Sequence, residues 1–244
     1  MRRLHRGQLP FLSRISLRAE QAGVSDSLAA REGWKRFRSA ASSHDLIVEL
    51  RRMAGTTERC SYCSDSLGAT VDHFLPITPH FEHTFDWRNL YWICDNCNRR
   101  KSAKMTFDPA TGQPLVVRPD RECPWDFLYL DTETGVITPR VHAPMFEPDR
   151  RGHETLRALP VLGFEPVLEG RRREIRRLLG AGHRALETRG TDEARAVILA
   201  FKEEHHGVKS WIAHHEGSEE SPWREIKAES PRLWRRLVTT SLLD

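Results

Sequence analysis

Hydrophobic positions recur with the 3.6-residue period of an α-helix in residues 31–55 and in two stretches of the last third of the chain. In residues 31–55, a capping box formed by Ser42 and Asp45 and a stop at Gly55 predict the ends of one helix. Residues 1–30 are polar and predict irregular structure. The apolar positions of the three stripes are Leu46, Ile47, Leu50 and Met53; Ile175, Leu178 and Leu179; and Ala194, Val197, Ile198 and Phe201.

Shorter runs in the middle of the chain predict strands. One strand is predicted over 69–73 and another over 115–117. A turn at its centre makes 127–138 a predicted hairpin. Residues 89–93 predict a helical turn, and 96–104 predict a short helix.

Together these elements predict an α+β protein with three regions. They are a basic helical region over 1–55, a central module with its following hairpin over 56–140, and a helical region over 141–244. A hydrophobic content of 39% and a charged content of 30% are ordinary for a globular protein. There is no membrane-length apolar run and no apolar signal segment after the basic N-terminus, so we expect no membrane association. The absence of a signal segment and the odd number of cysteines, five, indicate a reducing compartment, so we predict a cytoplasmic location.

The net charge of +4 is unevenly distributed. Basic residues outnumber acidic ones in 1–59 and 171–244, whereas acidic residues predominate in 105–170. Basic flanks would suit a phosphate backbone, but solvated helix faces explain the same pattern. The same two alternatives apply to the arginines at 171–173, 176 and 177.

Four of the five cysteines form two Cys-x2-Cys pairs, Cys60 with Cys63 and Cys94 with Cys97, separated by 30 residues. Two such pairs supply the four thiolates of one tetrahedral zinc ion and leave no open position, so the predicted zinc is structural. Two disulfides or four unrelated buried thiols are the alternatives. The fifth cysteine, Cys123, has no partner and is predicted to be an inert thiol.

Residues between and beside the cysteine pairs suit hydrolysis of a phosphodiester, which needs a base, a divalent ion and a group that orients the base. His73 suits the base, and Asp72 and Asn98 offer oxygen ligands for Mg²⁺ or Mn²⁺. Asn89 would tie the loop together by hydrogen bonds. Because neighbours on a strand point to opposite faces, Asp72 and His73 can serve one site only where the chain bends, as Pro76 shortly afterwards suggests.

This order of residues resembles the HNH (ββα-metal) endonucleases, in the version whose hairpin and helix are held by a structural zinc. The resemblance implies His73 as general base, Asp72 and Asn98 as ligands of the catalytic ion, and Asn89 as the loop-ordering asparagine. Lys101 falls on a common family lysine, with phosphate contact or packing as its role. The implied activity is metal-dependent hydrolysis of DNA.

Further segments of the chain resemble one subgroup, the HNH subunit of the Septu anti-phage system (PtuB-like), which also occurs with some retrons. This second resemblance implies phage or plasmid DNA as substrate and a partner ATPase of the ABC/SMC type that gates the nuclease. The alternatives are a stand-alone restriction-type HNH nuclease and a non-catalytic, zinc-stapled DNA-binding module. The segments concerned are 1–10, 33–37, 85–90, 118–137 and 153–171.

Other conspicuous residues have ordinary explanations. The remaining histidine clusters are predicted to lie at the surface: His80 and His83, His205 and His206, His214 and His215. Three tryptophans near the end of the chain are predicted either to be core or to anchor a partner protein: Trp211, Trp223 and Trp234.

Overall fold

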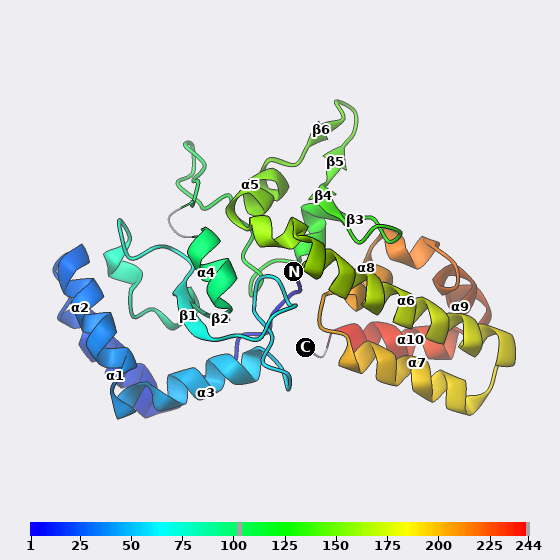
Figure 1. The fold of residues 1–244 in the computed structure, drawn as a ribbon, viewed down its shortest axis with the longest axis horizontal. Helices are drawn as coiled ribbons and strands as arrows, with labels where there is room; N and C mark the ends of the chain where they lie inside the picture. The colour runs from blue at the N-terminus through cyan, green and yellow to red at the C-terminus, as the bar shows by residue number, and fades with distance from the viewer. Residues whose placement is uncertain (102–103, 243–244) are drawn as a thin grey trace.

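A computed structural model describes residues 1–101 and 104–242. Three helices precede the central hairpin and lie together beside it (Figure 1): α1 (Phe11–Ala22), α2 (Ser27–Arg38) and α3 (His44–Met53). The expectation of irregular structure over 1–30 is therefore wrong. In α1 the buried positions Ser13 and Leu17 are four residues apart, and the Asp26 side chain caps α2 by accepting two backbone N–H bonds.

Helix α3 confirms the apolar stripe predicted within 31–55. It ends at Met53, just before Gly55, whose φ of +84° is a conformation that glycine adopts at little cost. The predicted capping box does not form. Asp45 instead accepts a hydrogen bond from Ser13 Oγ at 3.0 Å, which ties α3 to α1.

The centre of the molecule is a ββα unit. The antiparallel strands β1 (Thr70–His73) and β2 (Leu90–Ile93) are followed by α4 (Asp95–Lys101). The strand predicted at 69–73 is confirmed. Of the helical turn predicted at 89–93, Asn89 ends a 3₁₀ turn, but 90–93 form a strand because their aromatic and branched side chains pair across β1. The predicted helix 96–104 corresponds to α4, with residues 102 and 103 outside the described residues.

The predicted hairpin at 127–138 is also present, as β3 (Leu128–Leu130) and β4 (Ile137–Pro139). A second, exposed hairpin follows, β5 (Val141–His142) with β6 (Glu147–Pro148). Residues 115–117 form no strand. The backbone N–H of Val117 donates instead to Thr155 Oγ1 at 2.8 Å, so a helix side chain takes the place of a sheet partner.

The helical last third forms its own cluster at the opposite end from α1–α3 (Figure 1). Two of its helices, α6 and α7, carry the predicted apolar stripes on buried faces. Trp211 and Trp223 belong to the core, and Trp234 packs against it half-buried. The cluster contains α6 (Glu165–Thr188), α7 (Thr191–Glu203), α8 (Val208–His214), α9 (Trp223–Glu229) and α10 (Pro231–Ser241). The preceding helix α5 (Arg150–Ala158) packs on β4 instead.

Arg6 connects the start of the chain to the ββα unit. Its guanidinium donates to the carbonyl oxygens of Trp87 (2.9 Å) and Leu90 (2.7 Å) and pairs with Asp120 at 3.1 Å. It also lies over the rings of Trp87 and Tyr91. No helix among the described residues is long and apolar enough to cross a membrane.

Candidate active site and metal centre

The four cysteines of the two Cys-x2-Cys pairs converge in the core. All are buried, their sulfur atoms lie within 4.8 Å of one another, and Cys63 Sγ is 3.9 Å from Cys94 Sγ. A disulfide would need about 2.05 Å, so the alternative of two disulfides is excluded. The backbone N–H groups of Tyr62 and Cys97 each donate to a sulfur at 3.4 Å, and hydrogen bonding to Cys60 lowers the pKa of the Cys63 thiol to about 6. This donor set fits a structural zinc ion.

Asp72 faces α4 from the second-last position of β1. Its Oδ2 accepts a hydrogen bond from Tyr62 Oη at 2.7 Å and lies 3.0 Å from Lys101 Nζ, which is itself only 1% exposed. Lys101 Nζ is also 3.3 Å from Asp72 Oδ1 and donates to the backbone oxygen of His73 at 2.9 Å. One ammonium group thus fixes both the carboxylate and the end of the strand.

His73 faces the opposite side of the hairpin. Its Nε2 lies 2.9 Å from the Thr84 carbonyl oxygen, and its ring meets the Trp34 ring edge-on at a centroid distance of 4.6 Å. Because a carbonyl oxygen can only accept, Nε2 carries the proton and Nδ1 keeps a lone pair. Burial lowers the pKa of His73 to about 4, so the imidazole is neutral near pH 7.

The side chains of Asp72 and His73 therefore contact opposite faces, as the regular pairing of β1 with β2 requires. Asn98 belongs to α4, the helix whose Lys101 contacts Asp72. It stands three residues before Lys101 on α4, a spacing that places both side chains on one helix face. The structure brings Asp72 and Lys101 together on one side of the hairpin and leaves His73 on the other.

Asn89 links the two ends of the loop between β1 and β2. Its Nδ2 donates to the carbonyl oxygens of Leu75 (3.1 Å) and His83 (3.0 Å), and its Oδ1 accepts from the Leu75 N–H at 2.7 Å. The side chain is 2% exposed. With these three bonds it holds the loop that carries Thr84, the partner of His73.

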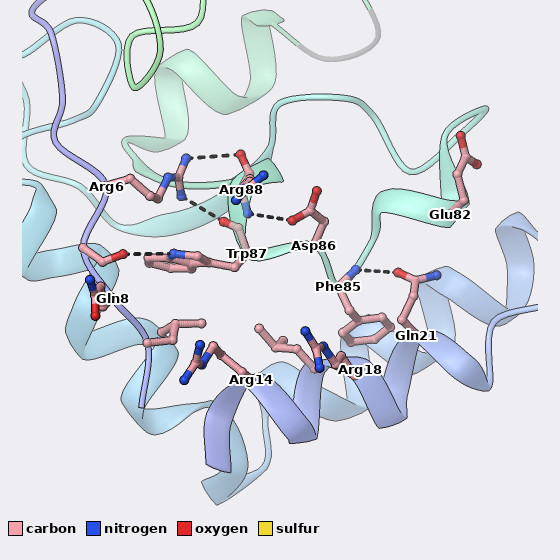
Figure 2. A pocket seen from close by; sticks show the side chains of 13 residues that line it. Arg6, Gln8, Arg14, Arg18, Gln21, Glu82, Phe85, Asp86, Trp87 and Arg88 are labelled. Carbon is pink, nitrogen blue, oxygen red and sulfur yellow. Dashed lines mark hydrogen bonds between the residues drawn. The ribbon is translucent and has the colours of Figure 1, made fainter. Parts of the chain in front are cut away.

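A basic pocket of about 540 Å³ lies between α1 and the segment 81–88. Figure 2 shows Arg14 and Arg18 on α1 facing the segment that carries Phe85 and Arg88. Arg14, Arg18 and Arg88 are exposed, and none of them pairs with a carboxylate in the described part of the chain. Phe85 lines the pocket and packs on Trp34, which in turn contacts His73.

The arginines of α6 differ in their surroundings. Arg173 and Arg176 both pair with Glu169, and Arg177 pairs with Glu174. Arg171 is buried. Neighbouring carboxylates therefore offset much of this positive charge, which favours the ordinary amphipathic helix over a nucleic-acid surface.

His206, His215 and Cys123 depart from the sequence expectations. His206 is 4% exposed rather than superficial, and burial lowers its pKa to about 2. Cys123 has a partner after all, because its Sγ lies 3.4 Å from Nε2 of His215, which is half-buried. No local sequence pattern predicts the contact between Cys123 and His215, because the two residues are far apart in the chain.

The ββα unit and the four-cysteine cluster lie in a segment that matches the model of a known protein family. Residues 60–104 match the model of the HNH endonuclease family. No curated protein matches the chain significantly. The matched segment contains both cysteine pairs, β1, β2 and α4. Residues 60–104 are therefore an HNH endonuclease module with a buried four-cysteine cluster, set between helical regions.

Proposed function

We propose that the chain is a metal-dependent endonuclease that hydrolyses phosphodiester bonds of DNA at its HNH module. The main support is the position of His73 in the matched segment: a neutral imidazole, fixed by Thr84, with Nδ1 left to accept a proton. In this proposal His73 Nδ1 removes a proton from the attacking water. Asn89 acts indirectly, by holding the loop that positions the Thr84 carbonyl group.

The residues on the other face suit a hard divalent ion. Tyr62 and Lys101 occupy Oδ2 of Asp72, whereas Oδ1 has only the longer contact to Lys101 and keeps lone pairs for a cation. Asp72 and Asn98 would hold Mg²⁺ or Mn²⁺ through oxygen atoms. Such an ion, when bound, stabilises charge on the scissile phosphate and the leaving oxygen.

The two faces set the position of the substrate. Asp72 contacts one side of the hairpin and His73 the other. A scissile phosphate would therefore lie across the outer edge of β1, within reach of both sides. The exposed Arg14, Arg18 and Arg88 beside the loop would contact neighbouring phosphates.

Substituting His73 with alanine tests the proposal. Purified wild-type protein should cut DNA in the presence of Mg²⁺ or Mn²⁺, and His73→Ala should lose at least about 100-fold in rate. Zinc content and circular dichroism should be unchanged. His153→Ala, which changes an exposed histidine on α5, is the matched control. Equal cleavage by His73→Ala and wild type would exclude His73 as the base, and DNA binding without cleavage by wild type would favour a non-catalytic module.

We further propose that the nuclease acts on phage or plasmid DNA under the control of an ABC/SMC-type ATPase, as in Septu systems. The support is the resemblance of segments outside the module, among them 33–37 and 118–137. The purified chain alone should then cut DNA slowly, and its ATPase should change the rate. Robust, sequence-dependent cutting without an ATPase would identify a stand-alone restriction-type nuclease instead.

A further inference from the structure

Cys123, Asp126 and His215 form a second cluster of metal-ligating side chains, outside the HNH module. Their ligand atoms lie within 4.8 Å of one another. Cys123 Sγ is 3.4 Å from His215 Nε2, which is 3.9 Å from Asp126 Oδ1. Ligands that share one tetrahedral zinc ion at 2.0–2.3 Å lie about 3.3–3.8 Å apart. The two separations that involve His215 are therefore already near the spacing that a shared ion imposes, and Cys123 and Asp126 need only a small adjustment.

The fold presents the first two ligands from one tight turn. Cys123 directly precedes the 3₁₀ turn Pro124–Asp126, and the Asp126 N–H donates to the Cys123 carbonyl oxygen at 3.1 Å. In 3₁₀ geometry, side chains three residues apart are eclipsed, so the thiol and the carboxylate lie on the same side. Trp125 anchors this turn: it is buried, and its Nε1 donates to the Gly207 carbonyl oxygen at 2.8 Å.

The third ligand is oriented by a different element. His215 follows the end of α8, where its N–H donates to the Trp211 carbonyl oxygen. Its ring lies nearly parallel to the Trp211 ring, with an interplanar angle of 5° and a centroid distance of 5.9 Å. Trp211 is itself buried in the core. The imidazole is thus held against a rigid surface, with Nε2 directed at Cys123.

One side of the cluster opens into a cavity of about 290 Å³. Arg3, His5 and His214 also line this cavity. His214 Nε2 already bonds Ser241 Oγ at 2.7 Å, and Ser210 Oγ lies 4.0 Å from Cys123 Sγ. A metal held by the three ligands would therefore keep a fourth position for water or for a small anion attracted by Arg3. Three protein ligands with one open position are typical of reactive rather than structural zinc sites.

We propose that Cys123, Asp126 and His215 bind a second zinc ion, with an exchangeable position facing this cavity. The mixed thiolate, imidazole and carboxylate set suits zinc better than magnesium, which prefers oxygen ligands. This site is independent of the nuclease proposal, because none of its ligands belongs to residues 60–104.

Counting zinc in the full-length protein tests this site. After saturation with Zn²⁺ and desalting, wild type should hold about two zinc ions per chain, whereas Cys123→Ser and His215→Ala should each hold about one. His214→Ala, which changes the neighbouring histidine, should keep both. Zinc retained at the four-cysteine cluster shows in every variant that the fold persists. The measurement does not depend on DNA cleavage. One zinc ion in wild type, or two in both Cys123→Ser and His215→Ala, would overturn the proposal.

Cobalt gives a second measurement of the same site. Co²⁺ bound at the four-cysteine cluster and Co²⁺ bound by one thiolate, one imidazole and one carboxylate differ in their visible and charge-transfer absorption. Titration of wild type should show both components, and His215→Ala should lack only the second. A wild-type spectrum with the four-thiolate component alone would contradict the site.

Discussion

Lys101 Nζ lies 3.0 Å from Oδ2 of Asp72, and both side chains are buried. Two opposite charges in such a place depend on each other, because each would otherwise be desolvated without compensation. Lys101 also donates to the His73 carbonyl oxygen. Of the two roles implied for this lysine, packing within the module agrees with these contacts, and a direct phosphate contact does not.

We predict that Lys101→Met destabilises the fold by roughly 3–5 kcal/mol, because it leaves the Asp72 carboxylate buried without its partner. Asp72→Asn should destabilise the fold by a similar amount, because it leaves the Lys101 ammonium group buried without its partner. The double variant should recover part of the stability while remaining unable to cleave DNA. Urea unfolding of all four proteins gives the coupling energy, and a value near zero would show that the pair is not a structural unit.

Asn89→Ala should loosen the loop between β1 and β2. The change removes three hydrogen bonds to Leu75 and His83 and leaves buried backbone groups unsatisfied, at a cost of roughly 1–3 kcal/mol. Cleavage should fall as well, because Thr84 no longer fixes the His73 ring. Asn89→Asp keeps the acceptor for Leu75 N–H but loses the donors, so it should lie between wild type and Asn89→Ala. Protection of the His83 and Thr84 amides from hydrogen exchange would report the loop directly.

The low pKa of His73 predicts a pH-dependent stability. Burial places this pKa at about 4 in the folded protein, below the ordinary value of 6.5, so the unfolded chain binds a proton first as the pH falls. The stabilising contribution is complete above pH 6.5 and is lost between pH 6.5 and about 4. The loss amounts to roughly 3 kcal/mol.

Urea unfolding of wild type and His73→Asn without added Mg²⁺ or Mn²⁺ measures this contribution. The stability advantage of wild type at pH 7 should shrink as the pH approaches 4, while groups common to both proteins cancel. Parallel stability curves for the two proteins would show that His73 titrates normally.

The contrast between paired and unpaired arginines predicts different effects on DNA binding. Arg14→Ala and Arg18→Ala should weaken binding, and each should reduce the slope of log K against log salt by about 1 if its side chain neutralises one phosphate. Arg173→Ala and Arg176→Ala should change the DNA affinity and its salt slope little, because Glu169 already offsets their charge. Fluorescence anisotropy at several salt concentrations distinguishes the two sets. Equal weakening by both sets would place DNA elsewhere on the protein.

Local patterns in the sequence predict much of the centre of this molecule. The cysteine spacing indicates the four-cysteine cluster, and the turn residues within 127–138 predict the hairpin that the structure contains. Both features depend on residues close in the chain or on a spacing characteristic of metal ligands. The roles of Asp72, His73, Asn89 and Asn98 stay predictions.

Features that depend on distant partners escape such patterns. Residues 90–93 form a strand because β1 pairs with them, and the Val117 N–H donates to Thr155 rather than to a neighbouring strand. The contact between Cys123 and His215 bridges 92 positions. The ion pair of Asp72 with Lys101 could have been suspected from the family lysine, but its burial depends on packing.

The contacts of Arg6 bear on how this nuclease module can be moved between proteins. Its guanidinium satisfies carbonyl groups of Trp87 and Leu90, and it covers two aromatic rings, from a position more than fifty residues before the first cysteine. In a transplanted fragment limited to 60–104, these carbonyl groups and rings would be exposed to water, because Arg6 would be missing. Domain grafting that preserves the fold should therefore carry the leading segment along, because the stable unit is larger than the matched segment 60–104.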